Sequence, residues 1–410
     1  MKVSIVTLGC KVNQYDSGGV ISILEASGVE TAEGLIFADA YIVNTCAVTK
    51  EAERKSRETI TKCLKLNQNA KVFVMGCASQ KNPSQFANKS ENVVYVNGNG
   101  DKKKVAELIA GTALSELPLE YEEFGVAKSE KTRAFVKVQD GCNNFCSYCI
   151  VPYLRGRSRS REIEKVVEEI RALKDVNEVV LCGINLSDFH GGDGLISLAE
   201  AVDTCGIRFR FGSLEERVIT DEFLNRLQKL KNFCPQFHLS LQSGSDAVLK
   251  RMNRKYTSSE YLLATEKIKK TFENANITTD VIVGFPGETE EEYEESEALA
   301  KAVGFGDMHV FPYSKREGTV AAKMEDLPKS VKTERAKRLA ALRDKLKDQY
   351  ISRFIGKTLT ALTEDIENGK RVGYTENYVK VYLPENVEGN KLVKVTLTEK
   401  FGDGALATPV

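Results

Sequence analysis

Three cysteines, Cys142, Cys146 and Cys149, lie in one short stretch, with three residues between the first two and two between the last two. Thiolates this close in sequence can converge on one iron–sulfur cluster, whose irons prefer sulfur ligands. A cubane cluster takes four ligands and no fourth cysteine lies nearby, so one iron would stay open for a substrate chelate, as catalytic zinc sites keep an open position. The stretch therefore predicts a metal-cluster loop that is a reaction site.

A structural zinc loop is the alternative, and it would need a fourth ligand from Cys182 or His190. The C-x3-C-x2-C spacing, with an aromatic residue before the last cysteine, resembles the radical S-adenosylmethionine (SAM) superfamily. That resemblance implies that the three cysteines hold a 4Fe–4S cluster whose open iron binds the amine and carboxylate of SAM. It also implies that Tyr148 packs beside SAM.

The composition is that of an ordinary globular chain. Its 410 residues, 42% of them apolar and 28% charged, suffice for two or three domains. No apolar run approaches the roughly 20 residues of a membrane span and the N-terminus predicts a strand, so we expect a cytoplasmic protein with no membrane partner. Ten cysteines in a reducing compartment favour metal ligation over disulfides. Lys plus Arg and Asp plus Glu number 58 each, so any nucleic-acid site must be a local patch.

Residues 1–112 show repeated strand–helix units, which are typical of a parallel α/β domain. Three apolar strands each end in a cysteine, at Cys10, Cys46 and Cys77. Because ligands lie beyond the carboxyl ends of parallel strands, these cysteines should meet at one edge of the sheet. A lone cysteine is more often a buried small apolar residue, as we expect for Cys63. Three at equivalent positions instead predict a second cluster, again with three protein ligands.

Residues 113–131 carry charges without apolar periodicity and predict an exposed linker. Residues 132–347 then alternate strands and amphipathic helices six times, which predicts a parallel sheet with right-handed crossovers. The expected strands are 134–139, 178–184, 208–214, 236–241, 278–283 and 307–313. Six units suit an incomplete (β/α)6 barrel with its active site at the C-terminal ends of the strands, where the three-cysteine loop falls.

A charged helix over 329–349 should lead into residues 348–410, which predict a small antiparallel β-barrel. Its expected strands are 357–362, 372–374, 378–383 and 392–397. Such barrels often bind single-stranded nucleic acid through aromatic and basic side chains, and Tyr374, Tyr378 and Tyr382 would supply stacking surfaces. Acidic and basic residues balance here, so composition leaves RNA binding open.

By resemblance to radical SAM enzymes, eight residues at the ends of the second to fifth barrel strands are expected around the cofactor. They are Gly183 and Asn185 for the methionyl group, Ser213 and Glu215 for the ribose, His238 and Gln242 in the cleft, and Gly284 and Gly287 in the adenine-binding turn. A plain turn at Asn185 and a core position for His238 are the alternatives. Glu216 departs from the family pattern, which commonly has Pro there. Cys182, Cys205 and Cys234 lack ligand spacing and are expected in core or surface positions.

Basic residues cluster after the cysteine loop and after the fourth and sixth barrel strands. Most charge runs are solvated faces, but arginines beside an active-site mouth suit bidentate contacts with phosphate. The candidates for RNA binding are Arg155, Arg157, Arg159, Arg161, Lys250, Arg251, Arg254 and Arg316.

Taken together, Cys10, Cys46, Cys77, the three-cysteine loop, the 241–245 block and the terminal barrel resemble the methylthiotransferases. The resemblance implies that the last barrel is a TRAM domain, an RNA-binding module, and that the N-terminal cysteines hold an auxiliary 4Fe–4S cluster that carries sulfur. One SAM would methylate that sulfur, and a second would be cleaved to a 5′-deoxyadenosyl radical that activates a C–H carbon. An electron donor such as flavodoxin or ferredoxin and a sulfur source are implied partners.

The residues after the first cysteine, Lys11-Val12-Asn13, are similar to those of the group that acts on N6-threonylcarbamoyladenosine beside the tRNA anticodon. The alternatives are enzymes acting on isopentenyladenosine in tRNA or on a ribosomal protein. The threonylcarbamoyl carboxylate would call for a basic cleft, with Arg155, Lys250 or Arg316 as candidate partners. A cluster-containing electron-transfer or RNA-binding protein is the non-enzymatic alternative, although it would explain only part of these features.

Overall fold

The computed structural model describes residues 1–410 except 101, 111–122, 124–131 and 193, so the expected linker lies almost wholly outside the described residues. The chain begins with a five-stranded parallel sheet in the order β2-β1-β3-β4-β5. Its strands are β1 (Lys2–Thr7), β2 (Glu30–Glu33), β3 (Ala40–Thr45), β4 (Lys71–Gly76) and β5 (Val93–Val96). The parallel sheet confirms the expected N-terminal fold and adds two short strands, β2 and β5, at its edges.

Helices cover both faces of this sheet, with one apolar cluster under each face. They are α1 (Lys11–Ala26), α2 (Lys50–Leu66), α3 (Cys77–Lys81), α4 (Ser84–Ala87) and α5 (Lys103–Ala110). The central strand β3 is buried along its whole length, as expected for a strand covered on both sides. We refer to residues 1–110 as the N-terminal unit.

Six parallel strands follow, and they confirm the six that the sequence predicts. They are β6 (Arg133–Lys137), β9 (Glu178–Cys182), β10 (Arg208–Phe211) continued by β11 (Ser213–Leu214), β12 (Gln236–Leu239), β13 (Asn276–Val283) and β14 (Asp307–Pro312). The third strand bends at Gly212, so its first part pairs with β9 and its second part with β12. The result is an open, curved sheet with β6 and β14 as its edges.

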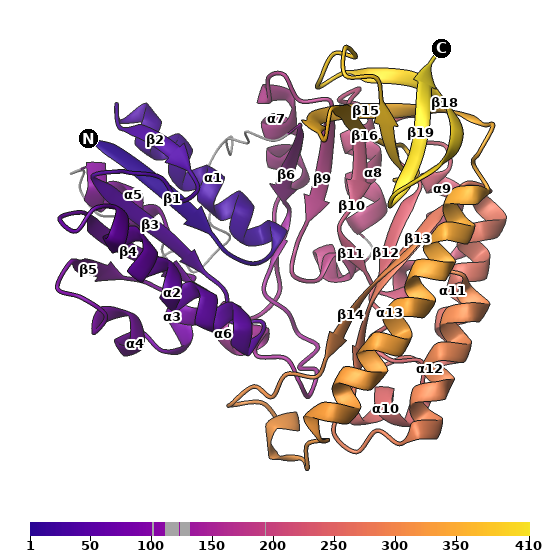
Figure 1. The fold of residues 1–410 in the computed structure, drawn as a ribbon, viewed down its shortest axis with the longest axis horizontal. Helices are drawn as coiled ribbons and strands as arrows, with labels where there is room; N and C mark the ends of the chain where they lie inside the picture. Colours follow the sequence, from indigo (N-terminus) through magenta and orange to yellow (C-terminus); the bar gives the residue numbers. More distant parts are fainter. Residues whose placement is uncertain (101, 111–122, 124–131, 193) are drawn as a thin grey trace.

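Helices and short elements connect these strands, and most of the helices cover the outside of the sheet, whereas α6 lies beside α3 of the N-terminal unit (Figure 1). The helices are α6 (Val151–Arg155), α7 (Ile163–Ala172), α8 (Gly194–Asp203), α9 (Asp221–Leu227), α10 (Asp246–Arg251), α11 (Ser258–Thr271) and α12 (Glu290–Val303). The short elements are the strand pair β7 (Gln139–Asp140) and β8 (Arg159–Ser160) and the 3-10 turns η1 (Leu186–Gly192), η2 (Glu216–Val218) and η3 (Ala321–Lys323).

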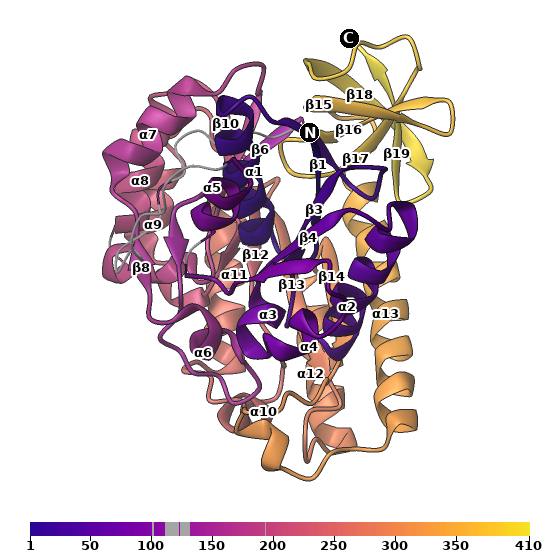
Figure 2. The same ribbon diagram turned by 90° about the vertical axis from the view of Figure 1, so that its left-hand side faces the viewer.

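The N-terminal unit lies beside the open side of this barrel (Figures 1 and 2). On one rim, α1 packs against β6. On the other rim, Arg316 in the loop after β14 donates through Nε to the Val48 carbonyl oxygen at 3.1 Å and pairs with Glu53 at 3.3 Å. The unit therefore contacts both rims of the open barrel.

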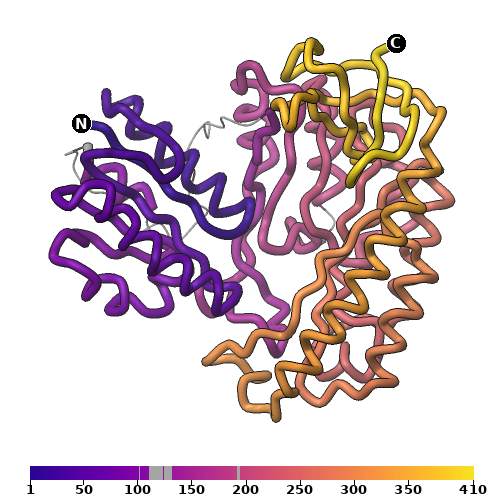
Figure 3. Tube along the Cα trace, viewed as in Figure 1, coloured from indigo at the N-terminus to yellow at the C-terminus, as the bar shows by residue number. Residues whose placement is uncertain are grey.

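The long helix α13 (Lys329–Ser352) runs along the outside of β14 and leads into a closed five-stranded barrel (Figure 3). Its strands are β15 (Thr358–Glu367), β16 (Lys370–Thr375), β17 (Lys380–Leu383), β18 (Leu392–Phe401) and β19 (Gly404–Pro409). Neighbouring strands pair antiparallel as expected, except that β17 and β19 pair in parallel.

This small barrel covers the N-terminal ends of the six strands. Arg208 at the start of β10 donates to the Thr360 carbonyl oxygen at 3.1 Å, and Asn276 at the start of β13 donates to the Asn377 carbonyl oxygen at 3.0 Å. Across the described residues, no helix is both long and apolar enough to span a membrane.

Candidate active site

The three N-terminal cysteines follow three adjacent strands and meet at one edge of the sheet. Cys10 caps α1 after β1, Cys46 follows β3, and Cys77 opens α3 after β4. Burial, together with the charges of Cys77 and Cys10, raises the pKa of the Cys46 thiol to about 11. The thiols are thus electrostatic neighbours, as the strand-end argument predicts.

Two glycines leave room for the chain segments that meet at this edge of the sheet. Gly9 and Gly76 both have a left-handed φ, of +100° and +104°. A Cβ on Gly9 would lie 2.8 Å from the Cys46 sulfur, and one on Gly76 would lie 2.5 Å from the Thr45 carbonyl oxygen. Sequence reasoning did not single out these glycines, although each immediately precedes a candidate cysteine.

The second set of cysteines lies in the loop after β7, which adjoins the C-terminal end of β6. Burial, together with the charges of Cys146 and Cys142, raises the pKa of Cys149 to about 12. The backbone N–H of Asn144 donates to the Cys142 sulfur at 3.5 Å, and Arg254 Nη1 donates to the Cys146 sulfur at 3.5 Å. Hydrogen bonds to sulfur of this kind stabilise thiolates.

Three thiol donors in each set suit the cysteine ligation of an iron–sulfur cluster. In the described part of the chain, no three His, Cys, Asp or Glu side chains are grouped as the ligands of one metal ion are. Neither proposed fourth zinc ligand joins the loop: Cys182 has Lys11 and Cys10 as its charged neighbours, and His190 Nε2 lies 3.2 Å from the Arg161 carbonyl oxygen.

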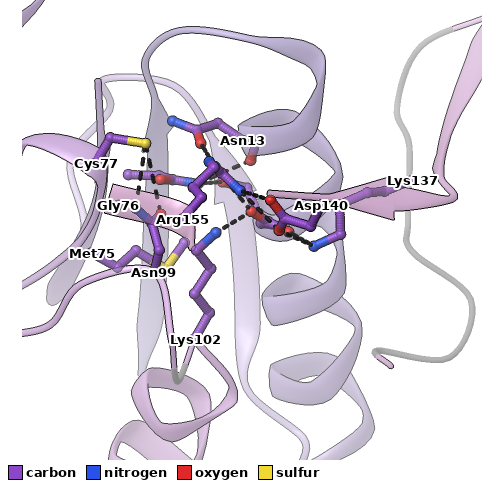
Figure 4. Close-up of polar contacts among 12 residues, drawn as sticks. Asn13, Met75, Gly76, Cys77, Asn99, Lys102, Lys137, Asp140 and Arg155 are labelled. Atoms are coloured by element: carbon purple, nitrogen blue, oxygen red, sulfur yellow. Dashed lines mark hydrogen bonds and ion pairs between the residues drawn. The ribbon is translucent and has the colours of Figure 1, made fainter. Parts of the chain in front are cut away.

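A buried ionic network lies beside the N-terminal cysteines (Figure 4). Asp16 pairs with Lys102, with Lys137 at 2.5 Å and with Arg155 at 3.6 Å, while Asp140 accepts from Arg155 at 3.0 Å. All five side chains are at most 10% exposed. Burial alone would raise the pKa of Asp16, but the attraction of Lys102, Lys137 and Arg155 outweighs it and lowers the pKa. The network joins the N-terminal unit to the barrel.

Arg155 also joins the two cysteine sets. It ends α6, just after the three-cysteine loop, and its Nη2 donates to Asn13 Oδ1 at 2.6 Å, three residues after Cys10. Asn99 Nδ2 donates to the Cys77 sulfur at 3.4 Å and to the Leu154 carbonyl oxygen at 3.2 Å (Figure 4). Three cations face two carboxylates in the network, and Cys77 and Cys10 are among the groups that raise the pKa of Arg155, so surplus positive charge lies close to this cysteine set. Thiolate ligands would neutralise it.

Two of the four strand-end segments expected at the cofactor adjoin the three-cysteine loop directly. Glu215 Oε1 accepts from Asn144 Nδ2 at 2.6 Å and pairs with Arg254 at 3.2 Å. The Tyr148 ring stands edge-on to Phe285 at 6.5 Å, inside the turn that Gly284 and Gly287 form with left-handed φ angles. Ser213 is exposed on its short strand.

Gly183 and Asn185 follow β9 against Gln139, which precedes the loop. A Cβ on Gly183 would lie 2.8 Å from Gln139 Oε1, and the Asn185 N–H donates to the same oxygen at 2.8 Å. The Asn185 Nδ2 is buried and has no hydrogen-bond partner among the described residues. A buried amide of this kind suits a polar ligand group.

Gln242 and His238 lie at different depths. Gln242, with φ +67°, bridges Val281 at the C-terminal end of the sheet. His238 lies lower in the lumen, with Nδ1 3.0 Å from Thr278 Oγ1 and Nε2 3.4 Å from Asp280 Oδ2, and it lines a cavity that reaches the small barrel. The structure therefore places His238 away from the strand-end segments that adjoin the cysteine loop.

Four of the eight basic candidates for RNA binding are largely buried. Arg155 has the partners given above; Arg161 pairs with Glu169 and Glu123. Arg316 pairs with Glu53, and Arg254 packs over Tyr256 at 4.8 Å. The run of basic residues in the sequence did not reveal these partners. Because the four arginines are buried, their guanidinium groups are not free to contact RNA phosphates. The partly exposed Arg251 pairs with Glu292, whereas Arg157 and Lys250 are exposed and Arg159 is half-buried.

The tyrosines of the small barrel are also engaged. Tyr374 and Tyr378 stack on one another at 4.7 Å, and Arg133 and Arg210 lie over their rings at 4.9 and 4.6 Å. Tyr382 packs edge-on to Phe401. The first two thus form the contact with the barrel strands rather than a free stacking surface.

The comparisons with known proteins agree with this geometry. Residues 136–300 match the radical SAM superfamily, and residues 2–98 match the uncharacterized protein family UPF0004. The Bacillus subtilis threonylcarbamoyladenosine tRNA methylthiotransferase MtaB is 38% identical over 96% of this chain and 93% of its own. The chain belongs to the radical SAM methylthiotransferase family. It is an enzyme, a tRNA methylthiotransferase of the radical SAM class.

Other methylthiotransferases align over similar lengths. The Aquifex aeolicus MtaB is 36% identical over 97% of this chain and all of its own. A Clostridium novyi tRNA-2-methylthio-N6-dimethylallyladenosine synthase is 35% identical over 88% of this chain and 85% of its own.

Solved structures show the fold alone. The radical SAM methyltransferase TsrM from Kitasatospora setae has a TM-score of 0.55 at 15% identity, covering 76% of this chain and 74% of that one. The cobalamin-dependent radical SAM enzyme OxsB has a TM-score of 0.54 at 12% identity, covering 86% of this chain and 56% of that one. The radical SAM fold that the cysteine loop predicts is thereby confirmed.

Proposed function

We propose that this methylthiotransferase adds a methylthio group to C2 of N6-threonylcarbamoyladenosine next to the tRNA anticodon. The observation that carries the proposal is the pairing of two three-cysteine sets, which Arg155 and Asn99 hold in a fixed relation. The relatives named for threonylcarbamoyladenosine, at 36–38% identity over nearly the full chain, support this substrate over the isopentenyl alternative.

In this proposal each cysteine set holds one 4Fe–4S cluster. Cys142, Cys146 and Cys149 hold the radical-forming cluster, and Cys10, Cys46 and Cys77 hold the auxiliary one. When bound, the clusters and two SAM molecules supply the radical, methyl and sulfur chemistry, which no side chain provides. A one-electron donor such as flavodoxin or ferredoxin and a sulfur source would serve the reaction from outside.

The chain's own residues would bind and orient these groups. The buried Asn185 amide is available to the methionyl group of SAM, while Glu215, at the mouth of the loop, is placed for the ribose. Tyr148 and the turn between Gly284 and Gly287 form one wall. Arg254, bonded to both Glu215 and the Cys146 sulfur, couples the ribose position to the loop.

For the tRNA, we propose three modules: residues 1–112 for the auxiliary cluster, 132–347 for radical formation, and 348–410 as a TRAM-type RNA-binding barrel. The cavity in the barrel lumen is lined by both edge strands and by the small barrel, so an anticodon stem-loop lying across these parts can insert a base. The surface groups proposed for phosphate are Arg157, Arg159 and Lys250.

Nucleoside mass spectrometry of tRNA from cells with and without the gene tests the substrate. We expect the methylthio-threonylcarbamoyl nucleoside to disappear and its precursor to accumulate. Loss of the methylthio-isopentenyl nucleoside, with the threonylcarbamoyl species unaffected, would refute the proposed substrate.

Iron analysis and product assays of two triple variants test the two clusters. Replacing Cys142, Cys146 and Cys149 with Ala should halve the roughly eight irons of the reconstituted protein and abolish SAM cleavage. Replacing Cys10, Cys46 and Cys77 with Ala should also halve the iron but preserve SAM cleavage to 5′-deoxyadenosine while abolishing methylthio product. Methylthio transfer by the second variant would exclude the auxiliary role.

A further inference from the structure

The lumen of the open barrel contains a cavity of about 650 Å³ that extends from Lys11, at the start of α1, to the small barrel. That volume is in the range of small-molecule sites and accommodates a modified base. Side chains of all six barrel strand positions reach it, and most of them are polar. In the proposed function, this is the cavity that a base of the tRNA would enter.

Nearly all cations in the cavity wall already have carboxylate partners. Arg133 and Arg210 pair with Glu178, Lys347 pairs with Asp307 at 2.9 Å, and Lys380 pairs with Glu367 at 3.0 Å. Within the described part of the chain, Lys11 is the lysine or arginine of this wall that has no carboxylate at ion-pair distance. An anionic ligand group in the cavity would therefore find its free counter-charge at Lys11.

The surroundings of Lys11 place its amine inside the lumen. Lys11 lines the cavity, and the charged groups that act on it are Cys182, Arg210, Asp280 and Arg133, on four different barrel strands. Burial lowers the pKa of the amine, and an anionic partner would raise it again. Asp280 attracts the amine from beyond ion-pair distance, and its carboxylate Oδ2 lies 3.4 Å from His238 Nε2. Lys11 is accessible to solvent in spite of this enclosure, so a ligand can reach it.

The same wall offers a stacking surface for a base. His309 lines the cavity and is exposed, its ring lying 6.0 Å from His238 and 6.4 Å from Phe311. Phe311, two positions further along β14, is 44% exposed but does not line the cavity. The exposed His309 ring is therefore the stacking surface for a nucleobase, an interaction worth about 1–3 kcal/mol per base.

We infer that Lys11 is a specificity-determining residue whose ammonium group binds the carboxylate of the threonylcarbamoyl group when the target adenosine enters the cavity. The inference rests on the proposed substrate. It replaces Arg155, Lys250 and Arg316, the carboxylate partners that the sequence suggested. Arg155 and Arg316 are buried with partners of their own, and Lys250 is exposed but does not line this cavity. An isopentenyl group, which carries no charge, would leave the Lys11 amine desolvated without a partner, and this mismatch would select against it.

The test compares two synthetic anticodon stem-loops that differ only in the threonylcarbamoyl carboxylate, which is free in one and a methyl ester in the other. Equilibrium binding to the reconstituted protein should favour the acid by about ten- to a hundredfold, the range of a charge-assisted hydrogen bond. Lys11→Met should reduce this acid-to-ester ratio to near one, and Lys11→Arg should retain most of it. Lys347→Met is the matched control, because Lys347 lines the same cavity but is paired with Asp307, and its ratio should match the parent.

Two further readouts separate a local effect from damage. Iron content and 5′-deoxyadenosine formation of Lys11→Met should equal those of the parent protein, although Cys10 is its neighbour. If Lys11→Met loses iron, the acid-to-ester binding ratio is measured with Lys11→Gln and with the parent protein instead. Equal binding of acid and ester by the parent overturns the inference. An unchanged ratio in Lys11→Met overturns it as well, while methylthiolation of threonylcarbamoyl tRNA by the parent would leave the proposed function standing. Methylthiolation of isopentenyl tRNA alone would overturn both.

Discussion

Replacing Asp16 with Asn should loosen the N-terminal unit from the barrel. Asp16 is fully buried and joins Lys102 of the N-terminal unit to Lys137 of β6. Lys137 and Arg155 would keep Asp140, but Lys102 would keep no carboxylate among the described residues. Leaving a buried charge without its partner costs about 3–5 kcal/mol.

Urea unfolding followed by circular dichroism measures this cost. With a slope of about 3 kcal/mol per molar, the affected transition should shift down by about 1 to 2 M urea. Because a chain of this size need not unfold in one step, hydrogen exchange of α1 and β6 should locate the change at their contact. Faster exchange is expected in both elements.

A second substitution tests whether charge is the cause. Lys102→Met in the Asp16→Asn background removes the unpaired ammonium group, so the double variant should be more stable than Asp16→Asn alone, with a coupling of about 2 kcal/mol. Glu51→Gln is the control, since Glu51 pairs with Arg54 at the surface of α2, and its urea midpoint should not change. An unchanged midpoint for Asp16→Asn, or simple addition in the double variant, would refute the reasoning.

Three other predictions concern single contacts. Burial raises the pKa of Glu216 to about 7, so the folded state holds a proton that the unfolded chain releases above about pH 4.5. The free energy of unfolding therefore falls as the pH rises between these two values. Glu216→Gln should raise it by about 2 kcal/mol at pH 8 but not at pH 4. Equal unfolding midpoints of variant and parent at pH 8 would contradict this. Asn99→Leu removes the hydrogen bond to the Cys77 sulfur and should speed iron loss from the N-terminal cysteine set to a chelator about tenfold or more. The rate is measured in a background that lacks the loop cysteines, so that only the N-terminal set holds iron. An unchanged rate would contradict this prediction. Arg157→Ala combined with Arg159→Ala should reduce the slope of log binding constant against log salt concentration for tRNA by about one to two phosphate contacts. An identical slope would show that neither arginine contacts phosphate.

Strand positions were predictable because their apolar runs are long and regular. All six barrel strands, and the three strands that precede Cys10, Cys46 and Cys77, lie where the sequence places them. The short edge strands β2 and β5 and the barrel strand β19 escaped prediction. Glu30–Glu33 has three polar residues out of four, Val93–Val96 is only four residues long, and Gly404–Pro409 begins and ends with turn residues. All three depend on a neighbouring strand to supply their hydrogen bonds, and a local pattern does not contain that information.

The cysteine sets were predictable for a related reason. Their residue type and spacing carry the chemistry locally, whereas the fate of a charged side chain depends on distant partners. Arg155 reads as part of a surface charge run, yet it is paired with Asn13, 142 positions away. Arg316 reaches Val48 across 268 positions. Lys11, in contrast, was noted for its place beside Cys10, while its lack of a partner became visible only once the lumen was assembled.

The N-terminal unit is attached at both rims of the barrel, and this double attachment fixes the position of one cysteine set relative to the other. Arg155 fixes the rim at β6 and Arg316 fixes the rim beyond β14, so the edge that carries Cys10, Cys46 and Cys77 cannot swing away about either contact alone. A carbon activated beside the three-cysteine loop would then meet a sulfur carrier at a set separation, because proximity in a reaction of this kind depends on prior alignment. If the two cysteine sets act as proposed, loss of either arginine should lower methylthio product more than SAM cleavage, because only the methylthio step would use both sets.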